Sequence, residues 1–295
     1  ATIEPRTRPV RVSIRRLENI DRLTLHLGAF GLDSEVPVEV RVEGQSLSTE
    51  GTPIRLERNE DGWAVRLAPW SAAERSPDRY GLFKRAFDRR FLLVVGTQGT
   101  VEMNAAMEEK ARLDASHWWY QANGAAEIVR DIDLDPDVVG ERNVVLYGNA
   151  TVNAAWRALL ANDATFQVRA GDALLDGRRL PGESLSALAV RPVDGQPRGW
   201  IGLVAATDAV AMRRLLPRRW FRSGLAHPDL TVWDATEPAA EGQQPAPRIV
   251  AAGFWADDFS AGEAASIWRR DTEPDPANSA EQRGRHEQTP TLLRQ

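Results

Sequence analysis

The residues whose types and spacing best suit binding chemistry lie in two glycine-containing turns. The segments GTQGTVEMN, which starts at Gly96, and GNATVN, which starts at Gly148, each follow an apolar stretch and precede a predicted helix. In open α/β sheets such turns flank the point where the strand order reverses, and helix N-termini there present free N–H groups to a ligand. The predicted lining of this crevice is Thr97, Gln98, Thr100, Gly148, Asn149, Thr151 and Asn153.

A structural role for the same residues is the competing interpretation. Glycine permits tight turns, and Thr and Asn are good helix N-caps, in any α/β fold whether or not a ligand binds. Neither turn has the GxGxxG or Walker pattern, and neither contains a lysine. Both interpretations stay open at the level of the sequence.

No recognisable catalytic or metal-binding constellation accompanies these turns, so we assign no catalytic residue, no metal ligand and no cofactor. The chain has no cysteine, and Gly182–Ser186 departs from the G-x-S-x-G serine elbow at its last position. The acidic run Asp131–Asp137 lacks the glycine and terminal glutamate of a calcium-binding EF-hand loop, so we interpret it as a solvated strand end. The histidines lack the spacing of zinc ligands: His26, His117, His227 and His286.

Two clusters of side chains have a structural and a functional interpretation. Trp118-Trp119-Tyr120 suits core packing better than a sugar-stacking platform, because adjacent helical residues point about 100° apart. A cluster of five arginines near the end of a predicted helix suits a solvated helix end, with a docking patch for an acidic partner as the alternative. It consists of Arg213, Arg214, Arg218, Arg219 and Arg222.

Composition limits the partners. The 295 residues carry a formal net charge of −5, which disfavours nucleic acid, since phosphate neutralisation needs a basic face. No run of 18 or more apolar residues exists, and we therefore expect no membrane partner.

Hydrophobic periodicity predicts a small module followed by a larger domain. Residues 1–78 alternate apolar and polar, which indicates an antiparallel β-meander or half-sandwich. Residues 79–268 contain continuous apolar runs such as Phe91–Val95, separated by helical patterns. They predict an α/β fold with a flavodoxin/Rossmann-like parallel sheet and helices on both faces. We expect residues 269–295 to form a disordered polar tail, and residues 237–247 a flexible loop.

Several ordered motifs resemble a known family between about Gly81 and Trp255. The family's opening pattern, G-P-I-x-D-A-F…P-F-L-x-V-x-G-T, is similar to Gly81–Phe87 followed by Phe91–Thr97. Its later pattern, D-x-D…N-L-V-L-x-G-x-x-x-x-N, is similar to Asp131–Asp133 followed by Asn143–Asn153. The family is the C-terminal region of large bacterial esterases related to the prolyl oligopeptidases. Two later strands also resemble that region, Pro228–Asp234 and Ile249–Trp255.

The resemblance implies a function and a partner. It implies a non-catalytic C-terminal region of a multidomain serine esterase or peptidase-like hydrolase, which supports the catalytic domain, substrate access or oligomerisation. The partner would be an α/β-hydrolase domain upstream in the same polypeptide, with homo-oligomerisation as a further role. Ala1 would then be a fragment boundary, and the resemblance favours a periplasmic or secreted location.

Two alternatives come from other functional classes. One is a small-molecule or carbohydrate-binding module that uses the crevice between the glycine turns. The other is a self-contained hydrolase with an atypical site. The family pattern also has a small Ser-Gly turn where this chain ends in Ala206-Thr207-Asp208, which argues against a function at that part of the sheet edge.

Overall fold

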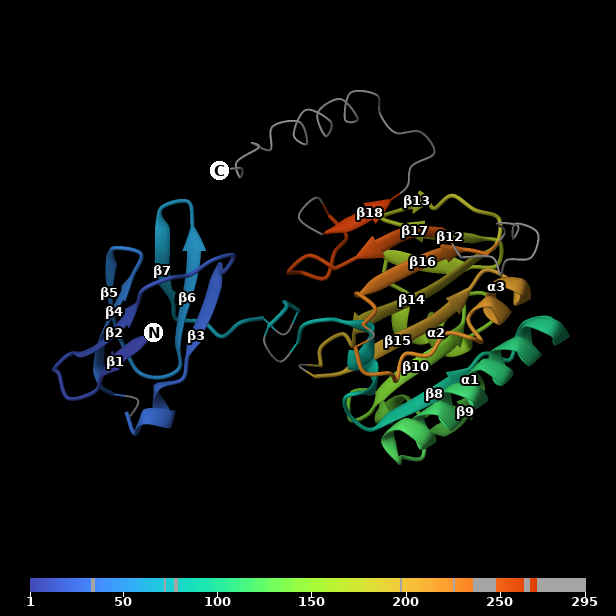
Figure 1. Ribbon diagram of the computed structural model, residues 1–295, viewed down its shortest axis with the longest axis horizontal. Helices are drawn as coiled ribbons and strands as arrows, with labels where there is room; N and C mark the ends of the chain where they lie inside the picture. The colour runs from blue at the N-terminus through green and yellow to red at the C-terminus, as the bar shows by residue number, and fades with distance from the viewer. Residues whose placement is uncertain are drawn as a thin grey trace, which may run out of the picture. The chain divides into compact units, whose positions relative to one another are not determined.

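The chain folds into two units, Ala1–Ser71 and Ala72–Gln295, and each has its own hydrophobic core (Figure 1). A computed structural model describes residues 1–32, 35–71, 73–76, 79–196, 198–224, 226–235, 248–262 and 266–269. The predicted loop 237–247, residues 270–295 of the predicted tail and His286 lie outside this range.

The first unit is built from two small sheets. One has the order β1-β2-β4-β5 and the other β3-β6-β7. The predicted alternation is confirmed in β2, where Val10, Val12 and Ile14 are buried and the residues between them are not. However, β2 and β4 are parallel, so the module is not wholly antiparallel. The elements are β1 (Thr2–Glu4), β2 (Val10–Ile14), β3 (Arg22–Leu25), η1 (Leu27–Phe30), β4 (Pro37–Val42), β5 (Gln45–Glu50), β6 (Ile54–Asn59) and β7 (Gly62–Arg66).

The second unit is organised around an eight-stranded mixed sheet with the order β18-β17-β16-β14-β15-β10-β8-β9. Neighbours from β9 to β15 are parallel, and every pair from β15 to β18 is antiparallel. Strands β8, β10 and β15 are buried throughout, as continuous apolar runs predict. The strands are β8 (Phe91–Val95), β9 (Glu127–Arg130), β10 (Asn143–Gly148), β14 (Leu185–Pro192), β15 (Trp200–Ala206), β16 (Leu230–Asp234), β17 (Arg248–Gly253) and β18 (Ile267–Arg269).

Three α-helices accompany this sheet in the described part of the chain. Helix α1 packs on α3 and on strands β8, β9 and β10 (Figure 1). Thr100 caps α1, as the sequence predicts: its side chain accepts a hydrogen bond from the Met103 amide. The remaining elements are η2 (Phe83–Phe87), α1 (Val101–Ala122), η3 (Asp131–Asp133), η4 (Pro136–Val138), α2 (Ala154–Leu160), β11 (Phe166–Arg169), β12 (Asp172–Leu175), β13 (Arg178–Arg179) and α3 (Ala209–Arg214).

The predicted fold class is wrong. The second unit is β-rich and mixed, not a flavodoxin/Rossmann-like parallel sheet with helices on both faces. The chain passes from β14 to β15 through residues 193–199, a connection too short for the crossover of roughly ten or more residues that parallel neighbours need. The strands β14, β16, β17 and β18 thus form an antiparallel half beside the parallel strands. None of the helices in the described residues has the length and apolarity to cross a membrane.

Candidate functional site

The two glycine turns meet at the carboxyl ends of β8 and β10. The Gly96 amide donates to the Tyr147 carbonyl at 3.1 Å, and the Gln98 amide donates to the Val152 carbonyl at 3.0 Å. The structure therefore brings together the residues that the sequence predicts as a crevice. What their side chains contact decides whether they are open to a ligand.

Asn153 is the centre of this region. Its side chain is fully buried, and its Oδ1 caps α2 by accepting from the Trp156 amide at 3.1 Å. Its Nδ2 donates to the carbonyls of Val94 at 3.3 Å and Tyr147 at 3.0 Å. One side chain thus ties the ends of β8 and β10 to the start of α2.

Asn149 extends the same network to the neighbouring strand. It is 1% exposed, and its Nδ2 donates to the Ala206 carbonyl at the end of β15 at 2.8 Å. Its Oδ1 accepts from the amides of Thr151 and Val152, which fixes the turn. Gly148 has φ of +122°, and a Cβ there would lie 2.6 Å from the Met107 sulfur, so both backbone and space require glycine.

Asp131, which directly follows β9, extends the network to a fourth strand. Its Oδ1 accepts from the Thr97 hydroxyl at 2.7 Å, and its Oδ2 accepts from the Ala154 amide at 2.6 Å. Asp131 is 5% exposed, so the interpretation of the acidic run as a solvated strand end is wrong for this residue. We call Asp131, Asn149 and Asn153, with Thr97, the edge network.

The remaining predicted site residues lie at the exposed margin of the edge network. Gln98 Oε1 accepts from the exposed Arg157 at 2.5 Å, and the Thr151 hydroxyl accepts from the Ala170 amide at 3.1 Å. Thr100 caps α1. Each predicted residue with a polar side chain therefore has a structural partner, and the buried ones make several. The edge network chiefly joins the ends of four strands, β8, β9, β10 and β15, to α2.

A buried Lys-Asp-Tyr network lies beneath α1 and has no counterpart in the sequence-based prediction. Lys110 Nζ donates to Asp114 Oδ1 at 2.7 Å, and the Tyr147 hydroxyl donates to Asp114 Oδ2 at 2.9 Å. Lys110 also donates to the Arg218 carbonyl at 3.0 Å and lies 3.8 Å above the Trp220 ring. The available signal was a Lys-Asp pair at i,i+4 on the same helical face as Met103 and Met107.

Burial dominates the protonation of this network. It raises the pKa of Asp114 to about 7, lowers the pKa of Lys110, and raises the pKa of Tyr147 well above its usual value. Groups with such pKa values are suited to acid–base chemistry. All three side chains are closed to solvent, with at most 1% exposure, so no substrate reaches them in this conformation. Their role here is to anchor α1.

A second buried ionic network holds the antiparallel half of the sheet. Asp229 pairs with Arg75 at 3.0 Å and accepts from the Trp255 amide at 3.1 Å. Gly81 must be glycine, because a Cβ would lie 1.8 Å from Asp229 Oδ1. Arg191 pairs with Asp163 at 2.6 Å. These contacts join distant segments of the second unit and present no exposed reactive group.

The histidines do not form a site in the described part of the chain. Burial and the nearby Arg219 lower the pKa of His117, whose Nδ1 is buried without a hydrogen bond. Burial and Arg218 lower the pKa of His227 to about 4. No group of three or more His, Asp or Glu side chains suited to a metal occurs among the described residues.

The predicted basic cluster is divided among different environments. Arg213 and Arg214 belong to the last turn of α3, as a dipole-complementing role predicts. Arg218 stacks 4.0 Å above the Trp233 ring. Arg219 and Arg222 line a small hollow of about 350 Å³ beside His117. Trp118 packs against Phe91 and Phe221, whereas Trp119 and Tyr120 are exposed.

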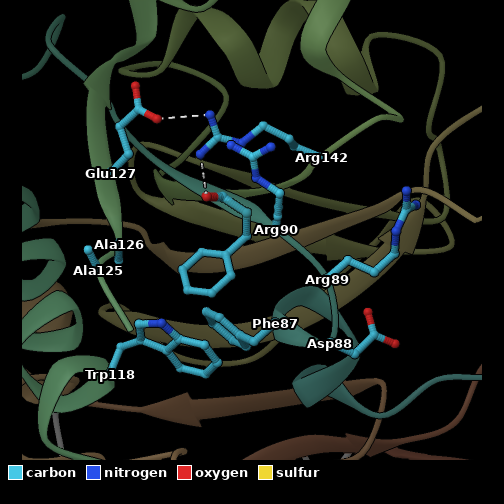
Figure 2. A pocket seen from close by; sticks show the side chains of 10 residues that line it. Phe87, Asp88, Arg89, Arg90, Trp118, Ala125, Ala126, Glu127 and Arg142 are labelled. Atoms are coloured by element: carbon cyan, nitrogen blue, oxygen red, sulfur yellow. Dashed lines mark hydrogen bonds and ion pairs between the residues drawn. The ribbon is translucent and has the colours of Figure 1, made fainter. Parts of the chain in front are cut away.

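The largest of the hollows we describe lies at the opposite, amino ends of β8, β9 and β10. It measures about 590 Å³. Figure 2 shows Trp118 and Phe87 at one end of it, with the head groups of Arg90, Arg142 and Glu127 at the other. We call it the amino-end hollow; its lining is Phe87, Asp88, Arg89, Arg90, Phe91, Trp118, Ala125, Ala126, Glu127 and Arg142.

Register explains why arginines gather at this end. Phe91 of β8 pairs with Asn143 of β10, so Arg90 and Arg142, which directly precede them, occupy equivalent positions. The Asn143 amide donates to the Arg90 carbonyl at 2.9 Å, which continues the pairing. The sequence-based prediction does not include this region, because it places the candidate site at the carboxyl ends of the strands, where α/β sheets usually bind ligands. The signal was an arginine just before each of two apolar runs.

Comparisons with known proteins add no relative: no protein-family model matches the chain, and no curated protein matches it.

Proposed function

We propose that the chain is a non-catalytic accessory region of a multidomain serine hydrolase of the esterase or peptidase-like kind. Its role would be to support the catalytic domain, frame substrate access or mediate oligomerisation. The observation that carries the proposal is the edge network. Asp131, Asn149 and Asn153 lie where an α/β sheet would meet a substrate, but each is buried and bonded to its own chain.

The proposal requires a partner with the catalytic chemistry. Sequence resemblance supplies its class, an α/β-hydrolase domain with a Ser-Asp-His triad, placed earlier in the same polypeptide. The carboxylates of Asp114 and Asp229 support a scaffold role, because they are 1% and 0% exposed and are bonded to side chains of the same chain. The same groups in an enzyme would be expected at the wall of an accessible cleft.

The first experiment tests the absence of catalysis. The purified chain is assayed on p-nitrophenyl butyrate with and without a fluorophosphonate, which reacts with activated serines. We expect the same slow hydrolysis as with heat-denatured chain. Turnover well above that background that the fluorophosphonate abolishes would overturn the proposal and favour a self-contained hydrolase.

The second experiment tests the partner. The coding sequence upstream of Ala1 should contain a G-x-S-x-G segment within about 300 residues, a span that accommodates one hydrolase domain. An upstream reading frame of that length without such a segment would contradict the assignment of an in-chain hydrolase partner.

Ligand binding in the crevice between the glycine turns is the second candidate function. It is favoured by the exposed side chains of Gln98, Thr100 and Thr151 at the margin of the edge network. A specific ligand raises stability by RT ln(1 + [L]/Kd), so thermal-shift screening with sugars, nucleotides and flavins tests it. A shift that disappears in Gln98→Ala would support this role. The absence of any shift would remove it.

A further inference from the structure

We propose that the amino-end hollow binds a small organic anion, a carboxylate attached to a flat apolar ring. This site is separate from the crevice between the glycine turns, and the inference does not depend on the hydrolase partner. It follows from the charges, donors and aromatic surfaces that the hollow presents. Its volume of about 590 Å³ falls within the range of about 300–1,000 Å³ typical of small-molecule sites.

Arg90 is the residue that most directly implies an anion. Its guanidinium makes no hydrogen bond or ion pair with the described residues, although it lines the hollow. Arg142, at the equivalent position of the next strand, donates to Glu127 Oε2 at 2.8 Å and to the Phe91 carbonyl at 2.9 Å. Figure 2 shows both head groups directed to the same end of the hollow. An oxyanion there would meet an unpartnered guanidinium, and guanidinium–carboxylate bonds are charge-assisted and bidentate.

The pairing of the charged groups in the lining favours a carboxylate over a phosphate. Of the three arginines that line the hollow, Arg142 pairs with Glu127 and Arg89 donates to three backbone carbonyls, which leaves only Arg90 without a hydrogen bond or ion pair among the described residues. Asp88 pairs with Arg85 at 2.9 Å, and Glu127 pairs with Arg142. The one unpartnered guanidinium matches a monoanion, whereas a dianionic phosphate would lie near Glu127 without full compensation.

The other end of the hollow suits a flat apolar ring. Phe87, Phe91 and Trp118 form an edge-to-face series, with ring centroids 5.2 Å and 5.0 Å apart. Trp118 is only partly buried, and its indole Nε1 forms no hydrogen bond with the described residues. Gly124 leaves room for that nitrogen, since a Cβ there would lie 2.4 Å from it. The ring of a ligand can therefore pack on Trp118 while its carboxylate reaches Arg90.

Calorimetric titration of the full chain with 2-naphthoate tests the proposal. We expect saturable binding to one site, weakened about tenfold in Arg90→Gln, because a hydrogen bond to a charged group is lost. The Arg90 side chain makes no hydrogen bond or ion pair with the described residues, so this variant should keep the wild-type melting temperature. Arg112→Gln is the matched control, since Arg112 is exposed on α1, pairs with Glu108 and lies outside the hollow.

Three further probes separate the parts of the proposal. Neutral 2-naphthol and acetate, which lack the charge and the ring respectively, should each bind at least tenfold more weakly than 2-naphthoate. Trp118→Leu should weaken 2-naphthoate severalfold, because the ligand's ring loses the indole on which it packs. Higher salt should also weaken binding, because Arg90 is exposed.

Four results would overturn the inference. They are no heat with 2-naphthoate at millimolar concentration, equal affinity in wild type and Arg90→Gln, equal affinity for 2-naphthol, and tighter binding of 2-naphthyl phosphate. The last result would assign the hollow to phosphate monoesters in place of carboxylates.

Discussion

Replacement of Asn153 by alanine should destabilise the second unit by about 3 kcal/mol. Loss of the α2 cap costs about 1 kcal/mol. Each of the two bonds from Nδ2 to the carbonyls of Val94 and Tyr147 contributes about 1 kcal/mol more. The Tyr147 carbonyl keeps its bond from the Gly96 amide, so the cost stays below that of an orphaned carbonyl.

Asn153→Asp separates the cap from the strand contacts. An aspartate retains the cap acceptor but loses both Nδ2 donors and places an oxygen against two carbonyl oxygens. It should therefore destabilise at least as much as alanine despite an intact cap. This outcome would identify the junction between β8 and β10 as the main contribution of Asn153.

Native-state hydrogen exchange of the β10 amides is the appropriate assay, because it reports opening of the second unit without interference from the first. Gln98→Ala is the control: its one side-chain bond is to the exposed Arg157, so the change should stay within about 0.5 kcal/mol. A loss below about 1 kcal/mol in Asn153→Ala would refute the reasoning. It would mean that the buried amide is not needed for the fold.

Three other changes test the pH response and packing of the second unit. The pKa of Asp114 in the folded state is about 7, above its usual 3.8, so the folded state holds a proton that the unfolded state releases. The resulting contribution to the free energy of unfolding is fully present at low pH and is lost as the pH rises through 7. Asp114→Asn should remove this decline in stability, which amounts to at most about 1.4 kcal/mol per pH unit. Urea titrations at pH 5 and 8 measure it, and an equal difference in stability between the two pH values in both proteins would contradict the prediction. The pKa of His227 is lowered to about 4, so its contribution to the free energy of unfolding is present above pH 6.5 and lost towards pH 4. Thermal unfolding of His227→Gln should therefore show a smaller loss of stability in acid than the wild type. An equal loss in both proteins would contradict this prediction. Gly202→Ala should lower the free energy of unfolding, measured by hydrogen exchange, by about 1–3 kcal/mol, because the new Cβ would lie 2.7 Å from Ala86 Cβ. An unchanged free energy would show that η2 can move away from β15.

Local structure was largely predictable from the sequence, whereas the sheet topology was not. The apolar run Phe91–Val95 and the cap at Thr100 correspond to β8 and α1 as predicted. The predicted direction of the strand Leu185–Pro192 is wrong, because a buried antiparallel strand and a buried parallel strand have the same continuous apolar pattern in the sequence. Only the seven-residue connection 193–199 distinguished them, and its length favours an antiparallel pair.

The predicted crevice residues are neighbours in space, but their partners were not predictable. Strand order and turn positions suffice to bring Gly96 near Asn153. The Asn153 amide bonds instead depend on carbonyls whose positions follow from three-dimensional packing. The amino-end hollow was missed for a related reason. Arg90 and Arg142 become neighbours only through the register of β8 and β10, which periodicity does not specify.

Intact-mass spectrometry after treatment with a fluorophosphonate tests the central claim most directly. A chain that lacks its own catalytic serine should show no stoichiometric adduct when folded, while a serine hydrolase treated in parallel is fully labelled. One adduct per chain that disappears on heat denaturation before treatment would contradict the account. It would identify an activated serine in this chain.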